Sequence, residues 1–160
     1  MTNIHQIEPP RASEVAMTLI RKTIWQRFSN KSVVSGLWLR EYVNTPLWPN
    51  CFLHVLPIKE YPYFKYYMKN IALMTPGERG LWIQGSDEDR IQYALDIEER
   101  SQGKSTANWS GVRELETELK KQYAKSFPFT YRGIIGYSYT LDDQKVIVGQ
   151  LNRDFWEGFK

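Results

Sequence analysis

The segment that most constrains the fold is residues 51–74, which begins with six residues of almost purely apolar character. In residues 51–56 apolar side chains occupy both sets of alternating positions, so a strand here would have two apolar faces. Pro57 ends this run, because proline cannot donate to a strand ladder. The sequence therefore predicts an interior strand that other parts of the chain cover on both sides.

Aromatic residues follow this strand at helical spacing. The apolar positions recur every three or four residues, at Tyr61, Phe64, Tyr67, Met68 and Ile71. This spacing predicts a short helix, in which Lys65 and Lys69 share a second face. One interpretation is an aromatic platform edged with positive charge, which suits single-stranded nucleic acid or an aromatic ligand. The other is a core helix whose tyrosine hydroxyls face water, and aromatic residues at this spacing more often pack in a core.

The fold class that these patterns predict is α+β. We expect a single domain over residues 1–160, with a mostly antiparallel sheet of four to five strands covered by an N-terminal helix and two central helices. The expected strands are residues 33–43, 51–56, 81–83, 129–140 and 145–151. The expected helices span about residues 14–28, 86–101 and 111–125. Residues 1–10, which end in two prolines, are expected to form a flexible arm.

Two helix starts carry specific capping signals. Ser13 precedes Glu14 and an apolar repeat that runs through Ile24, which fits an N-cap. Ser86 is followed three residues later by Asp89, the spacing of a capping box. Both signals place the helix starts independently of the apolar pattern.

The cysteine count limits the chemistry and the setting of the protein. Cys51 is the single cysteine, so the chain can form no internal disulfide and no cysteine-based zinc site. The N-terminal residues lack the apolar run of a signal peptide, and no stretch is apolar enough to span a membrane. We therefore expect a cytoplasmic protein that has no membrane partner, no cofactor and no bound metal.

Charge is distributed unevenly along the chain. Residues 1–80 carry ten Lys or Arg against five Asp or Glu, so this half holds the positive excess of a chain with net charge +3. The aromatic segment lies in the same half, which indicates a non-catalytic binding or regulatory module that contacts an anionic partner, nucleic acid first among them. A protein partner is the alternative. The candidate binding residues are Arg21, Lys22, Tyr61, Tyr63, Phe64, Lys65, Tyr66 and Lys69.

Two other functions remain open from the sequence. A small carboxylate-dependent hydrolase or nuclease could use Glu118 or Asp142 as metal ligands. A small-molecule pocket could lie under the aromatic face of Tyr131, Tyr137 and Tyr139. No catalytic residue is assigned, and the balance favours binding over catalysis.

Two motifs resemble functional sites but lack their context. Residues 103–106 read Gly-Lys-Ser-Thr, yet Glu98 stands where a phosphate-binding loop needs its first glycine. The two helices around this loop are too far apart for a helix-turn-helix. Cys51 and His54 would point to opposite faces of a strand, so we expect each to be a packed core residue rather than a catalytic pair.

Overall fold

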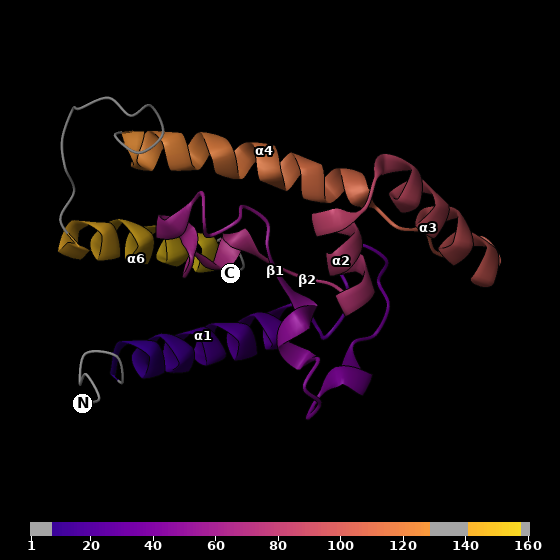
Figure 1. Cartoon of the computed structure of the whole chain (residues 1–160), viewed down its shortest axis with the longest axis horizontal. Helices are drawn as coiled ribbons and strands as arrows, with labels where there is room; N and C mark the ends of the chain where they lie inside the picture. Colours follow the sequence, from indigo (N-terminus) through magenta and orange to yellow (C-terminus); the bar gives the residue numbers. More distant parts are fainter. Residues whose placement is uncertain (1–7, 129–140, 158–160) are drawn as a thin grey trace.

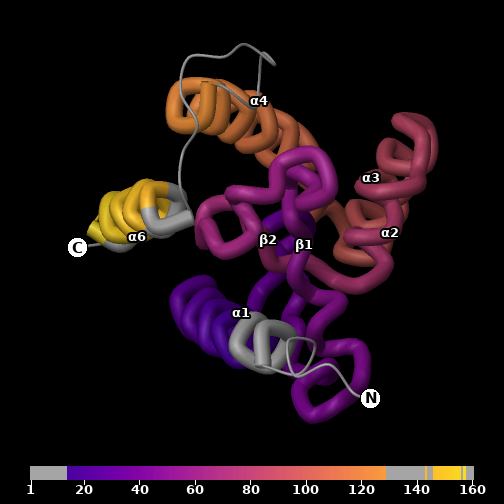
Figure 2. Tube along the Cα trace, turned by 60° about the vertical axis from the view of Figure 1, so that its left-hand side comes forward, coloured from indigo at the N-terminus to yellow at the C-terminus, as the bar shows by residue number. Residues whose placement is uncertain are grey.

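A short antiparallel hairpin lies at the centre of the molecule, and helices surround it (Figures 1 and 2). The computed structural model describes residues 8–128 and 141–157. Helix α1 (Glu8–Arg27) and helix α4 (Trp109–Ser126) lie on opposite sides of the hairpin, and α6 (Leu141–Glu157) flanks it on a third side. Helices α2 (Pro76–Gln84) and α3 (Asp87–Arg100) lie near the N-terminal end of α4.

The hairpin pairs β1 (Phe52–His54) with β2 (Ile71–Leu73). The ladder continues beyond the strands, because the Val55 amide donates to the Asn70 carbonyl at 2.8 Å. Directly opposite residues share a face of an antiparallel pair. Phe52 and His54 therefore lie on one face with Ile71 and Leu73, and Leu53 and Ala72 lie on the other.

Each face of the hairpin belongs to a separate apolar core. The face that carries Phe52 packs with Met17 and Ile24 of α1. The opposite face packs with α4 residues, among which Leu119 and Tyr123 are almost fully buried. The prediction that residues 51–56 form a buried strand is therefore correct in kind, although the strand is three residues long.

The predicted sheet of four to five strands is wrong. In the described part of the chain the sheet has two strands, and five α-helices make up most of the fold. Residues 33–43 form turns around a 3-10 helix, η2 (Arg40–Tyr42), residues 81–83 belong to α2, and residues 145–151 belong to α6. The expected strand at residues 129–140 lies outside the described residues.

Packing explains the strands that were wrongly predicted. Residues 145–151 are rich in β-branched side chains, but Ile147 and Val148 lie four and three residues before Leu151, and all three pack against the larger core. This contact outweighs their strand preference, which is a weak bias. In residues 33–43 the backbone turns at Gly36, whose φ is +76°. The next residue, Leu37, is exposed, so it does not contribute to a buried apolar face of the kind that a strand here would need.

The expected helices in other parts of the chain are present. Helices α1, α3 and α4 cover the three predicted helical ranges, and Ser86 and Asp89 form the predicted capping box. Helix α1 begins at Glu8, so Ser13 lies inside the helix and its predicted role as N-cap is wrong. Pro9 and Pro10, which were expected in the arm, are helical.

The aromatic segment between the strands is not a helix. It contains two 3-10 helices, η4 (Pro62–Phe64) and η5 (Met68–Asn70), and residue 71 onward is strand. The buried side chain of Asn70 fixes this connection, since it accepts from the Leu56 amide at 2.8 Å and donates to the Leu56 and Phe64 carbonyls. An amide that satisfies three backbone groups stabilises an irregular segment that has no ladder of its own.

Candidate functional site

His54 is the polar side chain of the β1 strand, and a backbone contact fixes its ring. Its Nε2 atom lies 3.0 Å from the Lys65 carbonyl oxygen. Because a carbonyl can only accept, Nε2 carries the proton and donates. The ring is half-buried, and it ties β1 to the end of η4.

Arg21 reaches the same face of the hairpin from α1. Its guanidinium carbon lies 5.9 Å from the centre of the Phe52 ring, and Phe52 precedes His54 by two residues on β1. The side chain is half-buried, and its Nε is buried without a hydrogen-bond partner among the described residues. A buried donor that lacks a partner is costly, so this arginine is not explained by packing alone.

Arg79 approaches from α2 and shows the same feature. Its Nε is buried and has no hydrogen-bond partner within residues 8–128 and 141–157. Among the described residues no ion pair joins Arg79 to the neighbouring Glu78, whose carboxylate accepts from Ser32 Oγ at 2.5 Å and Tyr93 OH at 2.6 Å. Glu78 also completes the capping box with Thr75 that fixes the start of α2. The helix is thus held firmly while its arginine remains unpaired.

The positive charges lie close enough to affect one another. Burial lowers the pKa of Arg21, and the charge of Arg79 lowers it further. Burial is also the main reason that the pKa of His54 is lowered, and the charges of Arg21, Arg79 and Lys65 add to this effect against the opposing hydrogen bond to the Lys65 carbonyl. We call Arg21, His54, Lys65 and Arg79 the basic cluster.

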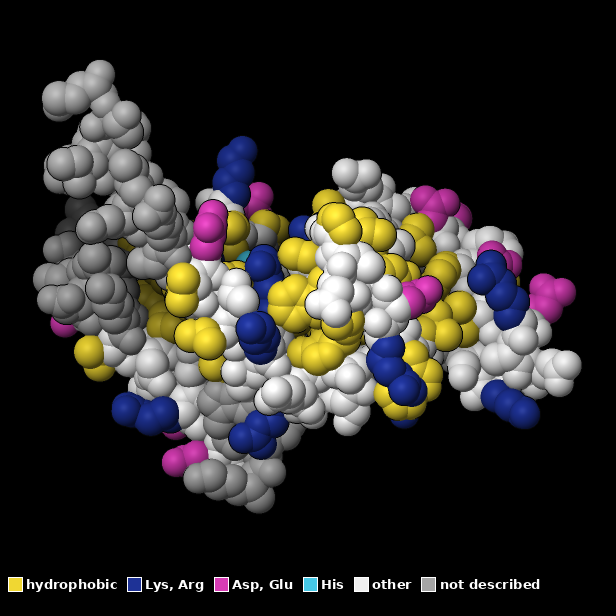
Figure 3. Space-filling model, turned by 90° about the horizontal axis from the view of Figure 1, so that it is seen from below, with side chains coloured by type: hydrophobic (Ala, Val, Ile, Leu, Met, Phe, Trp, Pro, Cys, Tyr) yellow, Lys and Arg dark blue, Asp and Glu magenta, His cyan; other side chains and the backbone are white. Residues whose placement is uncertain are grey.

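No acidic side chain in the described part of the chain forms an ion pair with the basic cluster. The ion pairs there join Asp87 to Arg90 at 3.2 Å and to Arg113 at 2.5 Å, and neither pair includes a residue of the cluster. Basic side chains also lie among apolar ones on the face seen from below in Figure 3. Four neighbouring cationic or protonatable groups that have no ion pair with a described carboxylate form a site whose charge an anion would balance.

The predicted binding residues do not form one continuous surface. Arg21 and Lys65 lie in the basic cluster, whereas the exposed Lys22 lines a separate hollow with Trp25 and Trp48. Lys69 lines a third region, an apolar pocket beside β2. The sequence pattern grouped these cations by their position in the chain, and the fold distributes them over three places.

The predicted aromatic residues mostly face the protein interior. The Phe64 side chain is 0% exposed, and the Tyr61 ring contacts Tyr123 edge-on at 5.0 Å. Tyr63 lies 4.8 Å from Phe127 between ring centroids. The half-buried Tyr66 lies next to Lys65, whose ammonium is 5.4 Å from its ring. These contacts favour the core interpretation of the segment over the stacking platform.

Sequence reasoning missed two members of the basic cluster. His54 was expected to be a packed core residue, and Arg79 lies outside the helices and strands that the sequence predicts. The one available signal was the alternation of Phe52 and His54, which places the imidazole on the same strand face as its aromatic neighbour. No local pattern indicates that Arg79 would meet Arg21.

The residues considered for a metal-dependent reaction lie apart from the cluster. Glu118 is exposed on α4, and the side chain of Asp142 is outside the described ones. Among the described residues no group of three or more His, Cys, Asp or Glu side chains could hold a metal ion. Cys51 is fully buried, and burial raises the pKa of its thiol to about 11.

Comparison with protein-family models, curated proteins and solved structures finds no match to this chain. In the stretches that the structure describes, no helix combines the length and apolar character needed to cross a membrane. The functional argument therefore depends on the geometry of the basic cluster.

Proposed function

We propose that the protein is a non-catalytic binding module that holds a phosphate-bearing partner through the basic cluster. The observation that supports this most is the juxtaposition of Arg21 and Arg79, two arginines whose buried Nε atoms have no hydrogen-bond partner among the described residues. Like charges placed together in a folded protein are destabilising unless an anion joins them. The cluster thus has the properties of a site that is completed by its ligand.

Arginine suits phosphate better than other cations do. Its planar guanidinium offers several donors in a fixed fork, which matches phosphate oxygens. The two arginines come from different helices, and His54 and Lys65 come from the hairpin and its connection. A site built on several rigid elements positions its ligand well. Nucleic acid is the polymeric form of such a ligand and fits the positive excess of residues 1–80.

Tryptophan fluorescence provides a direct test. The Trp25 ring lies 6.2 Å from the Phe52 ring, against which Arg21 also packs, so a ligand there would alter its emission. The protein would be titrated with pyrophosphate and with single- and double-stranded oligonucleotides at two salt concentrations. We expect saturable binding that weakens with salt, and a loss of about tenfold in affinity in Arg21→Gln or Arg79→Gln, since one charge-assisted contact is worth about 1.4 kcal/mol or more.

Lys22→Gln is the matched control, because Lys22 is the exposed neighbour of Arg21 on α1 and the substitution removes the same charge. Equal losses in Lys22→Gln and Arg21→Gln would mean that only the overall charge matters and would contradict the proposed site. Binding of pyrophosphate alone would indicate a small phosphate ligand, whereas binding of oligonucleotides alone would indicate nucleic acid. Absence of binding to every probe at low salt would refute the proposal.

A further inference from the structure

A second cavity, unrelated to the basic cluster, opens beside the outer edge of β2. Its volume is about 340 Å³, which is within the range of small-molecule sites. Four parts of the chain contribute to its wall: the loop after α1, the η5–β2 segment, α4 and α6. We call this cavity the β2 pocket.

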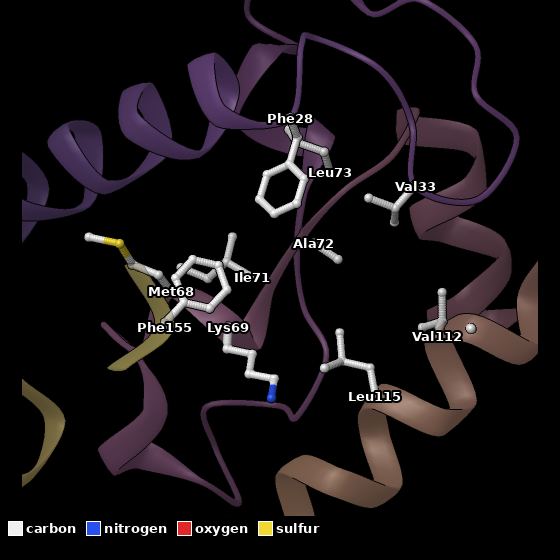
Figure 4. Close-up of a pocket in the computed structure, with 11 residues that line it drawn as sticks. Phe28, Val33, Met68, Lys69, Ile71, Ala72, Leu73, Val112, Leu115 and Phe155 are labelled. Atoms are coloured by element: carbon white, nitrogen blue, oxygen red, sulfur yellow. The ribbon is translucent and has the colours of Figure 1, made fainter. Parts of the chain in front are cut away.

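The wall of the β2 pocket is apolar apart from one cation. Figure 4 shows Leu115 of α4, Phe155 of α6 and Phe28, which directly follows α1, reaching toward the space. Lys69 is the one charged residue among those that line it. Its side chain is half-buried, and it has no ion pair or hydrogen bond from its ammonium to any described residue. The pocket thus combines a large apolar surface with a single unpaired positive charge.

The helices and the hairpin hold this pocket open. The Val33 amide donates to the Leu73 carbonyl at 2.8 Å and fixes one wall to the strand edge. On the other side, the Asn152 side chain accepts from the Met68 amide at 2.9 Å and donates to the Tyr66 carbonyl at 3.0 Å, which fixes α6 beside η5. A cavity held by such backbone contacts is suited to a ligand of defined shape.

We infer that the β2 pocket binds a small amphipathic carboxylate, with its apolar body between Phe28 and Leu115 and its carboxylate on the Lys69 ammonium. Transfer of an apolar chain from water into this pocket is favourable in proportion to the area that it buries. Lysine is a compact point charge with no fork geometry, so it pairs readily with one carboxylate. The basic cluster takes no part in this binding, so this site and the proposed function succeed or fail independently.

Octanoate, octanol and octylamine separate the apolar contribution from the charged one, because they share a chain and differ in the head group. Each would be titrated by calorimetry, with chemical-shift mapping of the Val112 and Leu115 methyl groups. We expect octanoate to bind more tightly than octanol by about tenfold, the effect of one charge-assisted contact, and octylamine to bind least. In Lys69→Met the octanoate affinity should fall to that of octanol, while octanol binding should not change.

Two further variants test the location. Leu115→Trp fills the pocket and should abolish binding of octanoate and octanol. Val33→Phe fills the pocket from the loop after α1. Because Val33 is 42% exposed, this variant should fold normally, so it tests the location even if Leu115→Trp fails to fold. Lys120→Met removes a charge from the exposed face of α4 and should leave binding unchanged. Failure of octanoate to bind, equal affinities for octanoate and octanol, or full binding in both filled variants would overturn the inference.

Discussion

At the scale of single residues, Arg79 shows a conflict between stability and binding. Its buried Nε has no partner in the described structure, and the charge of Arg79 disfavours the neighbouring Arg21 guanidinium. We predict that Arg79→Gln raises the free energy of unfolding by about 1 kcal/mol, because it removes an unpaired buried donor and a like-charge repulsion. Urea unfolding without ligand measures this change.

The exposed Arg100 at the end of α3 gives a control for the loss of one positive charge. Arg100→Gln should alter the unfolding free energy by no more than about 0.5 kcal/mol. If Arg79→Gln were strongly destabilising, Arg79 would be a structural cation, and the account of the basic cluster would be wrong.

His54 makes a pH-dependent contribution to stability. Burial and the neighbouring positive charges lower its pKa in the folded state. Its pKa in the unfolded chain is near the usual value of about 6.5, so on acidification the unfolded state takes up the proton first. The contribution is therefore fully present above about pH 6.5 and is lost as the pH falls from there through the lower folded pKa.

This linkage can be measured by urea unfolding at about pH 7.5 and about pH 5.5, on either side of the ordinary histidine pKa. The wild type should lose more stability between these pH values than His54→Asn does. An identical loss in both proteins would show that His54 does not contribute.

Only part of the basic cluster could be predicted at the residue scale. Arg21 and Lys65 were candidates because positive charge and aromatic residues coincide in their half of the chain. Arg79 and His54 join them because their charges act on one another across α1, α2 and β1, an arrangement that depends on how distant segments pack. A single sequence carries no signal that these distant residues lie close together in the fold.

At the scale of secondary-structure elements, Glu78 connects three of them. Its carboxylate accepts from Ser32 in the loop after α1 and from Tyr93 in α3, and it accepts from the Thr75 amide at 2.9 Å to cap α2. Burial raises the pKa of Tyr93, and its hydrogen bond to Glu78 adds to this effect, so the phenol remains a donor. This fully buried carboxylate therefore sets the position of α2 and of Arg79.

We predict that Glu78→Ala lowers the free energy of unfolding by about 3 kcal/mol, because it leaves several buried groups unpaired and removes a helix cap. Glu114→Ala, at an exposed position on α4, is the control and should change stability by no more than about 0.5 kcal/mol. Similar stabilities for the two variants would contradict the role assigned to Glu78.

The elements that could be predicted are those with local signals. The Ser86 capping box and the helix expected at about residues 111–125 depend on neighbours in sequence, and both predictions are confirmed. The β2 strand was missed because the aromatic spacing around it resembles a helix, while its extended form depends on pairing with β1. The helix α6 was missed because its β-branched residues favour a strand until they meet the larger core.

At the scale of the whole molecule, a small hairpin organises helices from both halves of the chain. Each face of the hairpin covers a different core, so α1 and α4 are held at a distance by β1 and β2 (Figure 2). This arrangement brings α1, α2 and the hairpin together around the basic cluster. It also leaves the β2 pocket between α4, α6 and the loop after α1.

The docking of α6 depends on Asn152, whose side chain bonds the Met68 amide and the Tyr66 carbonyl. We predict that Asn152→Ala speeds amide hydrogen exchange throughout α6 and leaves exchange in α4 unchanged, because it removes both polar contacts to the hairpin connection. Gln150→Ala, an exposed position on the same helix, is the control. Unchanged exchange in α6 of Asn152→Ala would show that apolar contacts alone hold the helix.

The central claim is that Arg21 and Arg79 share an anionic ligand, and arginine side-chain NMR tests it most directly. The Nε–H resonances of Arg21, Arg79 and Arg113 would be followed as pyrophosphate or an oligonucleotide is added. We predict that the signals of Arg21 and Arg79 shift together and saturate, while that of Arg113, which is paired with Asp87, does not move. Unchanged signals for both cluster arginines, or equal shifts for all three, would contradict the account.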